Sequence, residues 1–381
     1  MLENLEPAPK LQTQPGFTPA IEFDGFEGQA TTPGYKEQPA NFDEFLQSAG
    51  IDPNDIEVIP PIRTSRWQQR EGGEWLVSYR FIFRKRNTEL DLPLLLHEAR
   101  KGAGKRKETK TNPKALVICP ADLQVGKTGS RGGTQQLIAD VMRSYARIEE
   151  QLKTGKYERI FIMDVGDLIE SFSSAANYNQ LESNDLSPMQ QVDVGITLML
   201  DLVKRAHKYA PVTYGSVASN HCQNRFKGMQ VGKPGLDDWG VVILQQLRRV
   251  TKELGLDVDY LIPQPHDEGF AFRYGINTIG VVHGHQANRP DGVKNWWANS
   301  TFGNQWVQPC DVLVSGHFHH LRVEELGQRY DSNGSKFWLQ CSTIDRGSDW
   351  YRRSHGEDST VGIVTFELHK DQAFAGQVIK L

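Results

Sequence analysis

The chain has 381 residues, and its 43 basic and 47 acidic side chains leave a net charge of -4. This balance excludes the globally basic composition of an obligate nucleic-acid coat protein, so any basic patch must be local. No run approaches the ~18 apolar residues of a membrane span, and the first residues lack the charged and apolar regions of a secretion signal. We therefore expect a soluble, cytoplasmic protein with no membrane partner.

The length exceeds the roughly 250–300 residues at which single cores stop growing, which predicts more than one domain. The four cysteines lie far apart without a C-x-x-C pattern, so neither a disulfide framework nor a thiolate zinc site is expected.

Residues 1–38 hold Pro, Gly, Gln and Thr without periodicity, which predicts a disordered or extended arm. A short helix is expected between Asn41 and Gly50. In "GGEWLVSYRFIFRKR" large apolar residues alternate from Trp75 to Phe83, which is typical of a half-buried strand after a turn. Residues 39–95 are thus predicted to form a small α+β domain.

Residues 96–114 are predicted to be a basic linker, because seven Lys or Arg stand against one Glu between residues 100 and 114. Two interpretations stay open for this segment. It is either a solvated joint between domains or a contact with a phosphate backbone.

Residues 115–381 read as one α/β domain. Strands are predicted at 115–120, 159–164, 212–218, 278–283 and 311–315, with helices at 134–154, 188–209 and 236–254. The later runs "KFWLQCST", "VGIVTFEL" and "FAGQVIKL" have no long helices between them, which predicts a second, more antiparallel sheet.

The stretch "ALVICPADLQVGKTGSRGGT" from residue 115 allows two interpretations. Gly126-Lys127-Thr128 resembles a phosphate-cradling nucleotide loop, and "RIFIMD" could follow it as the acidic strand of such a site. That loop needs its helix to begin at the Lys-Thr pair, whereas helical spacing begins only near Thr134. The alternative, a D-x-Q metal motif at Asp122 and Gln124, is favoured.

Every predicted strand of the series is followed by metal-competent side chains. Ligands of open α/β sheets bind outside the carboxyl ends of the strands, so these groups are expected to converge. The four later strand ends read "MDVGDLIES", "SVASNHCQNR", "VVHGHQ" and "LVSGHFHH".

These motifs resemble, in order and rough spacing over residues 115–345, those of the calcineurin-like metallophosphoesterases. The resemblance implies a two-sheet αββα metallophosphoesterase sandwich, preceded here by the small α+β unit. Within that superfamily, "GDLIES" and "GHFHH" look most similar to SbcCD-type DNA repair nucleases and to phage-encoded relatives.

The resemblance also implies two divalent metal ions that clamp the attacking and leaving oxygens of a phosphoryl displacement. Their mixed oxygen and imidazole ligands suit manganese, iron or zinc, with Mn²⁺ expected. Asp167 would bridge both ions. The first ion would add Asp122, Gln124 and His319, and the second would add Asn220, His283 and His317.

His221 resembles the family's catalytic histidine, which protonates the leaving oxygen or stabilises developing charge. We expect Glu170 to orient it. Arg131 and Arg225 follow metal motifs and are candidates for holding substrate phosphate, although surface ion pairs explain them equally well.

Two positions depart from the family pattern. The family usually has His where this chain has Gln124, and an amide oxygen is the weaker ligand for a transition metal. Cys222 replaces the acidic residue that commonly follows Asn-His, which removes a potential hydrogen-bond acceptor near the metal. His285, His320 and the aromatic stretch "NWWANSTFGNQW" could serve the site or serve only the protein's structure.

The leading hypothesis is a metal-dependent phosphodiester hydrolase, specifically a DNA nuclease with nucleic acid as its partner. One alternative is a phosphatase or phosphodiesterase acting on a small nucleotide or a phosphoprotein. The other is a non-catalytic nucleic-acid-binding protein with a structural metal. The sequence leaves open an ATPase partner, the oligomeric state, and exonuclease against endonuclease action.

Overall fold

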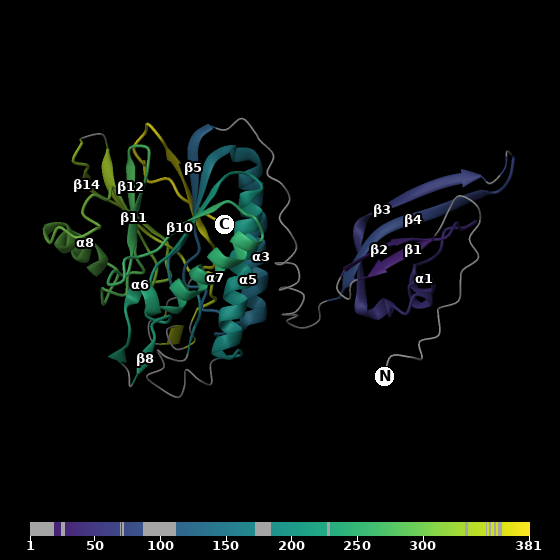
Figure 1. Cartoon of the computed structure of the whole chain (residues 1–381), viewed down its shortest axis with the longest axis horizontal. Coiled ribbons are helices and arrows are strands. Elements are labelled where there is room, and N and C mark those ends of the chain that lie inside the picture. Colours follow the sequence, from purple (N-terminus) through teal and green to yellow (C-terminus); the bar gives the residue numbers. More distant parts are fainter. Residues whose placement is uncertain are drawn as a thin grey trace. The chain divides into compact units, whose positions relative to one another are not determined.

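The computed structural model describes residues 19–23, 27–68, 70, 72–86, 112–171, 184–226, 229–331, 334–347, 349, 352–353, 356 and 360–381. The chain divides into two compact units, residues 1–94 and 95–381 (Figure 1). The basic segment 96–111 lies outside the described residues, and residues 112–114 already belong to the first strand of the large unit.

The small unit is a four-stranded antiparallel sheet in the order β1-β2-β4-β3, with one short helix. Its elements are β1 (Ala20–Phe23), β2 (Glu27–Thr31), α1 (Asp43–Ser48), η1 (Pro53–Asp55), β3 (Ile56–Gln68) and β4 (Trp75–Lys85). The helix and the alternating strand were both expected. Tyr79, Phe81 and Phe83 on alternate positions of β4 are buried in the core of this unit.

β1 and β2 correct the expectation of a disordered or extended arm over residues 1–38, of which residues 1–18 and 24–26 lie outside the described residues. β2 pairs with β4 with Ala30 opposite Phe81, and Ala30 is fully buried. Gly28 packs so closely on the ring of Phe83 that a side chain there would overlap it. Backbone pairing and a small-residue contact hold this strand, so the apolar alternation that identifies most strands is missing.

The first sheet of the large unit has the order β10-β7-β6-β5-β16-β17. Its strands are β5 (Asn112–Cys119), β6 (Tyr157–Asp164), β7 (Val212–Ser216), β10 (Val258–Leu261), β16 (Val364–His369) and β17 (Ile379–Lys380). β5, β6, β7 and β10 run parallel, and β16 pairs antiparallel with β5. The associated helices are α3 (Thr134–Gly155), α5 (Pro188–His207), α6 (Pro234–Asp237) and α7 (Trp239–Glu253), close to the predicted ranges (Figure 1).

The second sheet has the order β11-β12-β13-β15-β14. Its elements are β11 (Phe270–Tyr274), β12 (Asn277–Val281), β13 (Val312–Ser315), β14 (Arg322–Gln328), β15 (Ser335–Gln340) and helix α8 (Gly292–Phe302). A separate hairpin is formed by β8 (Arg225–Phe226) and β9 (Met229–Gln230).

This topology corrects the predicted division of strands. β12 and β13 were expected in the first series, yet they lie in the second sheet, where β13 runs parallel to both β12 and β15. β16 and β17 were expected in the second sheet and lie in the first. An apolar run shows that a strand is buried but not which sheet it joins, because strand pairing depends on contacts distant in sequence.

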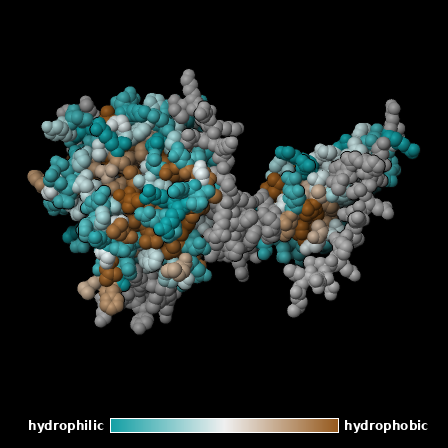
Figure 2. Space-filling model, viewed as in Figure 1, coloured by the Kyte–Doolittle hydropathy of each residue, from teal (hydrophilic) through white to brown (hydrophobic). Residues whose placement is uncertain are grey.

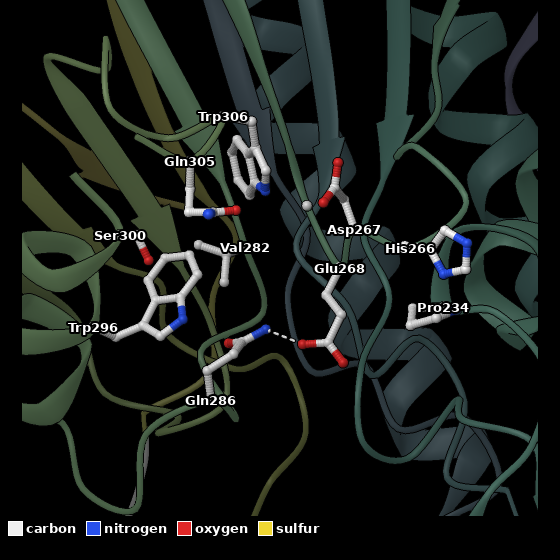
Figure 3. Close-up of a pocket in the computed structure, with 11 residues that line it drawn as sticks. Pro234, His266, Asp267, Glu268, Val282, Gln286, Trp296, Ser300, Gln305 and Trp306 are labelled. Atoms are coloured by element: carbon white, nitrogen blue, oxygen red, sulfur yellow. Dashed lines mark hydrogen bonds between the residues drawn. The ribbon is translucent and has the colours of Figure 1, made fainter. Parts of the chain in front are cut away.

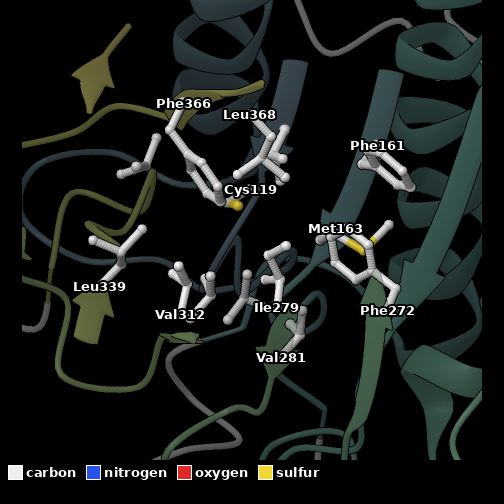
Figure 4. Close-up of a cluster of buried hydrophobic side chains, with 14 of the residues drawn as sticks. Cys119, Phe161, Met163, Phe272, Ile279, Val281, Val312, Leu339, Phe366 and Leu368 are labelled. Carbon is white, nitrogen blue, oxygen red and sulfur yellow. The ribbon is translucent and has the colours of Figure 1, made fainter. Parts of the chain in front are cut away.

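The two sheets pack face to face. Side chains from β5, β6 and β16, including Cys119, Met163 and Phe366, meet side chains from β12 and β15, including Ile279 and Leu339 (Figure 4). The four cysteines are buried and free, as expected.

The second sheet is covered on both faces. On β13, Val312 and Val314 face the first sheet, while Leu313 packs with Trp297 of α8 and Trp338 in a separate core. With α5 and α7 against the first sheet, α3 packed on α5, and α8 against the second sheet, the layers are helix, sheet, sheet and helix, which confirms the predicted αββα sandwich.

On the face of the large unit seen in Figure 2, hydrophilic residues surround hydrophobic ones in the middle, and further apolar residues appear at the lower edge, where Figure 1 places β8. Phe226 and Met229 of this hairpin are 63% and 69% exposed. No helix in the described part of the chain combines the length and apolarity needed to cross a membrane.

Candidate metal centre

The loops that follow β5 and β6 are joined by backbone hydrogen bonds. The amide of Asp122 donates to the carbonyl of Gly166 at 3.0 Å, and the amide of Gln124 donates to the carbonyl of Asp167 at 2.8 Å. The first two predicted motifs are therefore held in a single bonded framework.

Backbone strain is concentrated on the predicted ligands. Eight described residues other than glycine have a positive φ, and five of them are Asp122, Gln124, Asp167, His317 and His319. Such conformations cost on the order of 1–3 kcal/mol each and persist where surrounding structure enforces them, typically at functional sites. The strain therefore supports a functional centre at this edge of the sandwich.

Atoms that could bind a metal converge around Asp167. His283 Nδ1 lies 2.9 Å from the carbonyl oxygen of Val165, to which it donates, so Nε2 is the ring atom that could bind a metal. That Nε2 lies 3.0 Å from Asp167 Oδ2 and 3.0 Å from Asn220 Oδ1. Carboxylate, amide and imidazole acceptors that face one another match the donor set of a divalent transition metal.

His317 completes this group, which we call the acceptor cluster: Asp167, Asn220, His283 and His317. The ligand atoms of Asp167, His283 and His317 lie within 4.8 Å of one another, and within the described ranges no other set of three His, Cys, Asp or Glu does so. The predicted second ion therefore has a fitting site.

The ionisation of the acceptor cluster follows from its burial and charges. Burial raises the pKa of Asp167, but the charges of His283 and His221 outweigh it and hold that pKa well below its usual value. Burial and the neighbouring charge of His283 lower the pKa of His317 to about 3. Asp167 is thus a carboxylate and His317 a neutral imidazole, the forms that bind metals. Burial lowers the pKa of His283, but the charge of Asp167 raises it to about 9, so Nε2 carries a proton that a bound metal would displace.

Gly166 makes this packing possible. Its φ is +98°, and a Cβ at this position would lie 2.7 Å from His283 Nδ1 and 2.7 Å from Ser219 Cβ. The Gly-Asp pair of the motif therefore serves both the turn and the close approach of His283.

The residues predicted for the first ion are arranged differently. Asp122 is fully buried and accepts from the amide of His317 at 3.0 Å, while His319 Nε2 lies 3.4 Å from Asp122 Oδ1. Gln124 Oε1, the expected metal ligand, accepts a hydrogen bond from Lys127 Nζ at 2.6 Å.

Lys127 also pairs with Asp345, with 2.7 Å between Nζ and Oδ2, and both side chains are nearly buried. Burial lowers the pKa of Lys127, but the carboxylates of Asp345, Glu170 and Asp122 raise it above its usual value. The sequence pattern indicates Lys127 only as part of a nucleotide loop, and it does not identify Asp345, which is 218 residues away. The position of Asp345 shortly after β15, where strands end at this edge, was the available signal.

His221 lies beside the acceptor cluster. Its amide donates to Asp167 Oδ1 at 2.9 Å, and its Nε2 lies 3.9 Å from Asp167 Oδ2. Its Nδ1 lies 3.2 Å from both Glu170 Oε2 and the carbonyl oxygen of Glu170. Burial lowers the pKa of His221, but the charges of Asp167 and Glu170 raise it to about 10. The geometry suits the expected orienting role of Glu170, which stays a prediction.

The candidates for phosphate binding lie in different surroundings. Arg225 Nη2 donates to Gln223 Oε1 at 2.7 Å, and Gln223 Nε2 lies 3.3 Å from His285 Nε2. The ring centroid of His285 is 5.5 Å from that of His283, which connects Arg225 to the rim of the acceptor cluster. Arg131 lies near Asp349, whose pKa is lowered by hydrogen bonds from Ser130 and, to a smaller extent, by the charges of Arg352 and Arg131. Their roles in substrate binding stay predictions.

The structure supplies an acceptor near the altered Asn-His motif. The Cys222 thiol is buried, and burial first and the nearby Asp238 carboxyl second raise its pKa well above the usual value, so it remains protonated. Asp238 Oδ2 accepts from the amide of Ser219 at 3.0 Å. Asp238 thereby anchors the loop that carries Asn220.

A cavity of about 320 Å³ adjoins the loop after β12 (Figure 3). Trp296 and Trp306 lie on one side of it and Glu268 on the other. Glu268 accepts from Gln286 Nε2 at 2.7 Å and lies 3.5 Å from His285 Nε2. The Trp-rich stretch of the sequence thus contributes both to a cavity wall and, through buried Trp297, to the core.

No protein-family model matches the chain, and no curated protein matches it. Among solved structures, Vps29 of Entamoeba histolytica complexed with Zn²⁺ is 12% identical, with a TM-score of 0.31, covering 70% of this chain and 98% of its own. A predicted phosphoesterase from Streptococcus pneumoniae is 10% identical with a TM-score of 0.27, covering 71% of this chain and 99% of its own. The yellow lupin purple acid phosphatase PPD1 is 12% identical with a TM-score of 0.33, covering 95% of this chain and 73% of its own. Because these overlaps are weak, the residues of the centre, and not the neighbours, indicate what the chain does.

Proposed function

We propose that the chain is a metal-dependent phosphoesterase that hydrolyses phosphodiester bonds, with DNA as its substrate. The observation that carries this proposal is the acceptor cluster, because His283 Nε2 faces Asp167 Oδ2 and Asn220 Oδ1 at 3.0 Å each. Its oxygen and imidazole donors, without thiolate, suit Mn²⁺, and iron or zinc are the alternatives. A cytoplasmic location, with nucleic acid as partner, goes with this proposal.

A bound divalent cation supplies a polarised phosphoryl oxygen and a water that is nucleophilic at neutral pH. The chain's own residues do the rest. Asp167 holds the amide of His221 through Oδ1 and so fixes the histidine beside the cluster. His221 then gives a proton from Nε2 to the leaving oxygen, while Nδ1 stays next to Glu170.

A basic face on the small unit supports DNA as the substrate. Arg63 of β3 stands directly opposite Arg80 of β4, and both are exposed. Like charges in directly opposite positions destabilise a sheet, so the pair suits a surface that meets an anion. The likeness of "GDLIES" and "GHFHH" to SbcCD-type nucleases favours the same substrate.

The cavity beside the centre favours a second candidate, a phosphodiesterase or phosphatase acting on a small nucleotide. Trp296 and Trp306 offer apolar walls to a base, and the cavity adjoins the loop that carries His283. A small substrate would fill this cavity and would not need the basic face of the small unit.

The test incubates the chain and Mn²⁺ with end-labelled single- and double-stranded DNA, and separately with a chromogenic phosphodiester and phosphomonoester. We expect DNA and the diester to be cleaved. Intact DNA with cleavage of a small ester would replace the nuclease by the second candidate. No turnover of any phosphate ester would contradict the phosphoesterase proposal as a whole.

The double variant Arg63→Gln/Arg80→Gln separates the two substrates further. We expect weaker DNA affinity with a shallower salt dependence, because two phosphate contacts are lost, and unchanged turnover of the chromogenic diester. Arg273→Gln, on β11 of the large unit and exposed, is the matched control. Equal DNA affinity of parent and double variant would show that Arg63 and Arg80 do not bind DNA.

A further inference from the structure

The place that the resemblance assigns to the first cation already holds a positive charge from the chain. Lys127 Nζ lies 2.6 Å from Gln124 Oε1 and 2.7 Å from Asp345 Oδ2. Gln124 Oε1 is the atom that would have bound that cation. The lone pair expected to face a metal faces an ammonium group instead.

Lys127 is held firmly in this place. Its side chain is 13% exposed and that of Asp345 is 12% exposed, so solvent screens the pair weakly. Asp345 Oδ2 also accepts from the amide of Gly347 at 2.9 Å, and the amide of Asp345 donates to Thr343 Oγ1 at 2.9 Å. Thr343 Oγ1 in turn donates to the carbonyl oxygen of Asp122 at 2.7 Å. The ion pair is thus bonded into the same backbone that presents Asp122.

Charge balance explains why a lysine and a second cation compete here. The buried carboxylate of Asp122 has His319 Nε2 at 3.4 Å from Oδ1, and the ammonium group of Lys127 also interacts with it. A divalent ion bound by Asp122 and Gln124 would lie against the ammonium group and would be repelled by it. The acceptor cluster, by contrast, presents Asp167, Asn220, His283 and His317 toward one another without this lysine.

We propose that Lys127 takes the place of the first cation, so that the centre binds one divalent ion, at the acceptor cluster, instead of two. This inference rests on the proposed function for the identity of the centre and deepens it by assigning the number of ions. Gln124 then acts as the partner of a lysine, which accounts for an amide where the family usually has an imidazole.

The test counts ions directly. Full-length protein, stripped of metal with a chelator, is dialysed against Mn²⁺, and bound manganese per chain is measured by elemental analysis and electron paramagnetic resonance. We expect one tightly bound Mn²⁺ with the six-line spectrum of an isolated ion. Two tightly bound ions, or the multiline spectrum of a coupled pair, would overturn the proposal even if the protein hydrolyses phosphodiesters.

Substitution of Lys127 tests whether its charge limits the number of Mn²⁺ ions bound per chain. Lys127→Met leaves Asp122 and Asp345 without the ammonium group, so we expect bound Mn²⁺ to rise toward two per chain with a coupled spectrum. Lys127→Arg keeps the charge and should stay at one. Lys114→Met, which removes another partly buried lysine paired with a carboxylate, Glu367, is the matched control and should also stay at one.

A Lys127→Met protein that folds, as judged by its circular dichroism, and still binds one ion would overturn the role of Lys127. If Lys127→Met does not fold, the ion count and spectrum of the parent still decide. The two proposals fail separately: a parent that binds one Mn²⁺ but cleaves no phosphate ester refutes the proposed function alone. A parent that binds none refutes both.

Discussion

The two halves of the candidate metal centre differ in how their negative charge is balanced. In the acceptor cluster, Asp167 is paired with His283, whose Nε2 would release its proton to make way for a bound cation. In the other half, Gln124 and Asp345 both bind the ammonium group of Lys127. The same order of metal motifs can therefore be completed by a bound ion or by a side chain of the protein, and only the side-chain contacts distinguish them.

Asp167→Asn has the largest expected effect, because it removes the charge at the middle of the acceptor cluster. We expect Mn²⁺ affinity and turnover to fall by more than the ~10–100-fold seen when a group that merely supports a metal ligand is lost. Titration calorimetry measures the affinity. Asp201→Asn, a carboxylate of α5 paired with Arg205, is the control. Parent-like Mn²⁺ affinity in Asp167→Asn would contradict the assignment of the cluster.

His221→Ala tests the group that lies beside the cluster but outside it. Loss of a general acid should lower kcat by about 10²–10⁴-fold, while Mn²⁺ affinity stays close to that of the parent. His369→Ala changes a partly exposed histidine near Glu367 and serves as the control. If metal affinity falls as steeply as kcat, His221 belongs to the metal site and not to the proton transfer.

Glu170→Gln has a smaller effect, which depends on pH. The charge of Glu170 is one cause of the raised pKa of His221, about 10, so its removal lowers that pKa. The acid form of His221 is then lost at lower pH, and the alkaline limb of the kcat/KM profile moves to lower pH. Above that limb the rate falls by about tenfold per unit of the move. A profile identical to that of the parent would show that Glu170 does not act on His221.

Gln124→Ala has a small expected effect on metal binding. It tests the half of the centre that Lys127 occupies. Because Gln124 Oε1 binds Lys127, its loss should change Mn²⁺ affinity far less than the roughly 10–100-fold loss typical for a group that supports a metal ligand. Titration calorimetry measures the Mn²⁺ affinity of Gln124→Ala, and the loss in Asp167→Asn is the reference for a large effect. A comparable loss in both variants would mean that Gln124 binds the ion.

Local sequence patterns predicted most strands and helices, and they missed what depends on pairing. The alternation from Trp75 to Phe83 identified β4, and the runs before Asp122 and Asp167 identified β5 and β6. β2 was not predicted, because its sequence EGQAT lacks apolar alternation. The strand is held by pairing with β4. The exchange of β12 and β16 between the predicted sheets has the same cause, since one buried strand resembles another.

The order of residues along the chain determined which side chains reach the edge that carries the candidate metal centre. Asp122, Asp167, Asn220, His283 and His317 each follow a buried strand, and the carboxyl ends of parallel strands meet at one edge of a sheet. The tertiary structure alone decided how these side chains are neutralised. Lys127 and Asp345 are 218 residues apart, and no spacing rule brings an ammonium group against Gln124. Electrostatic balance in a buried site depends on every charge within a few ångströms, whatever its distance along the sequence.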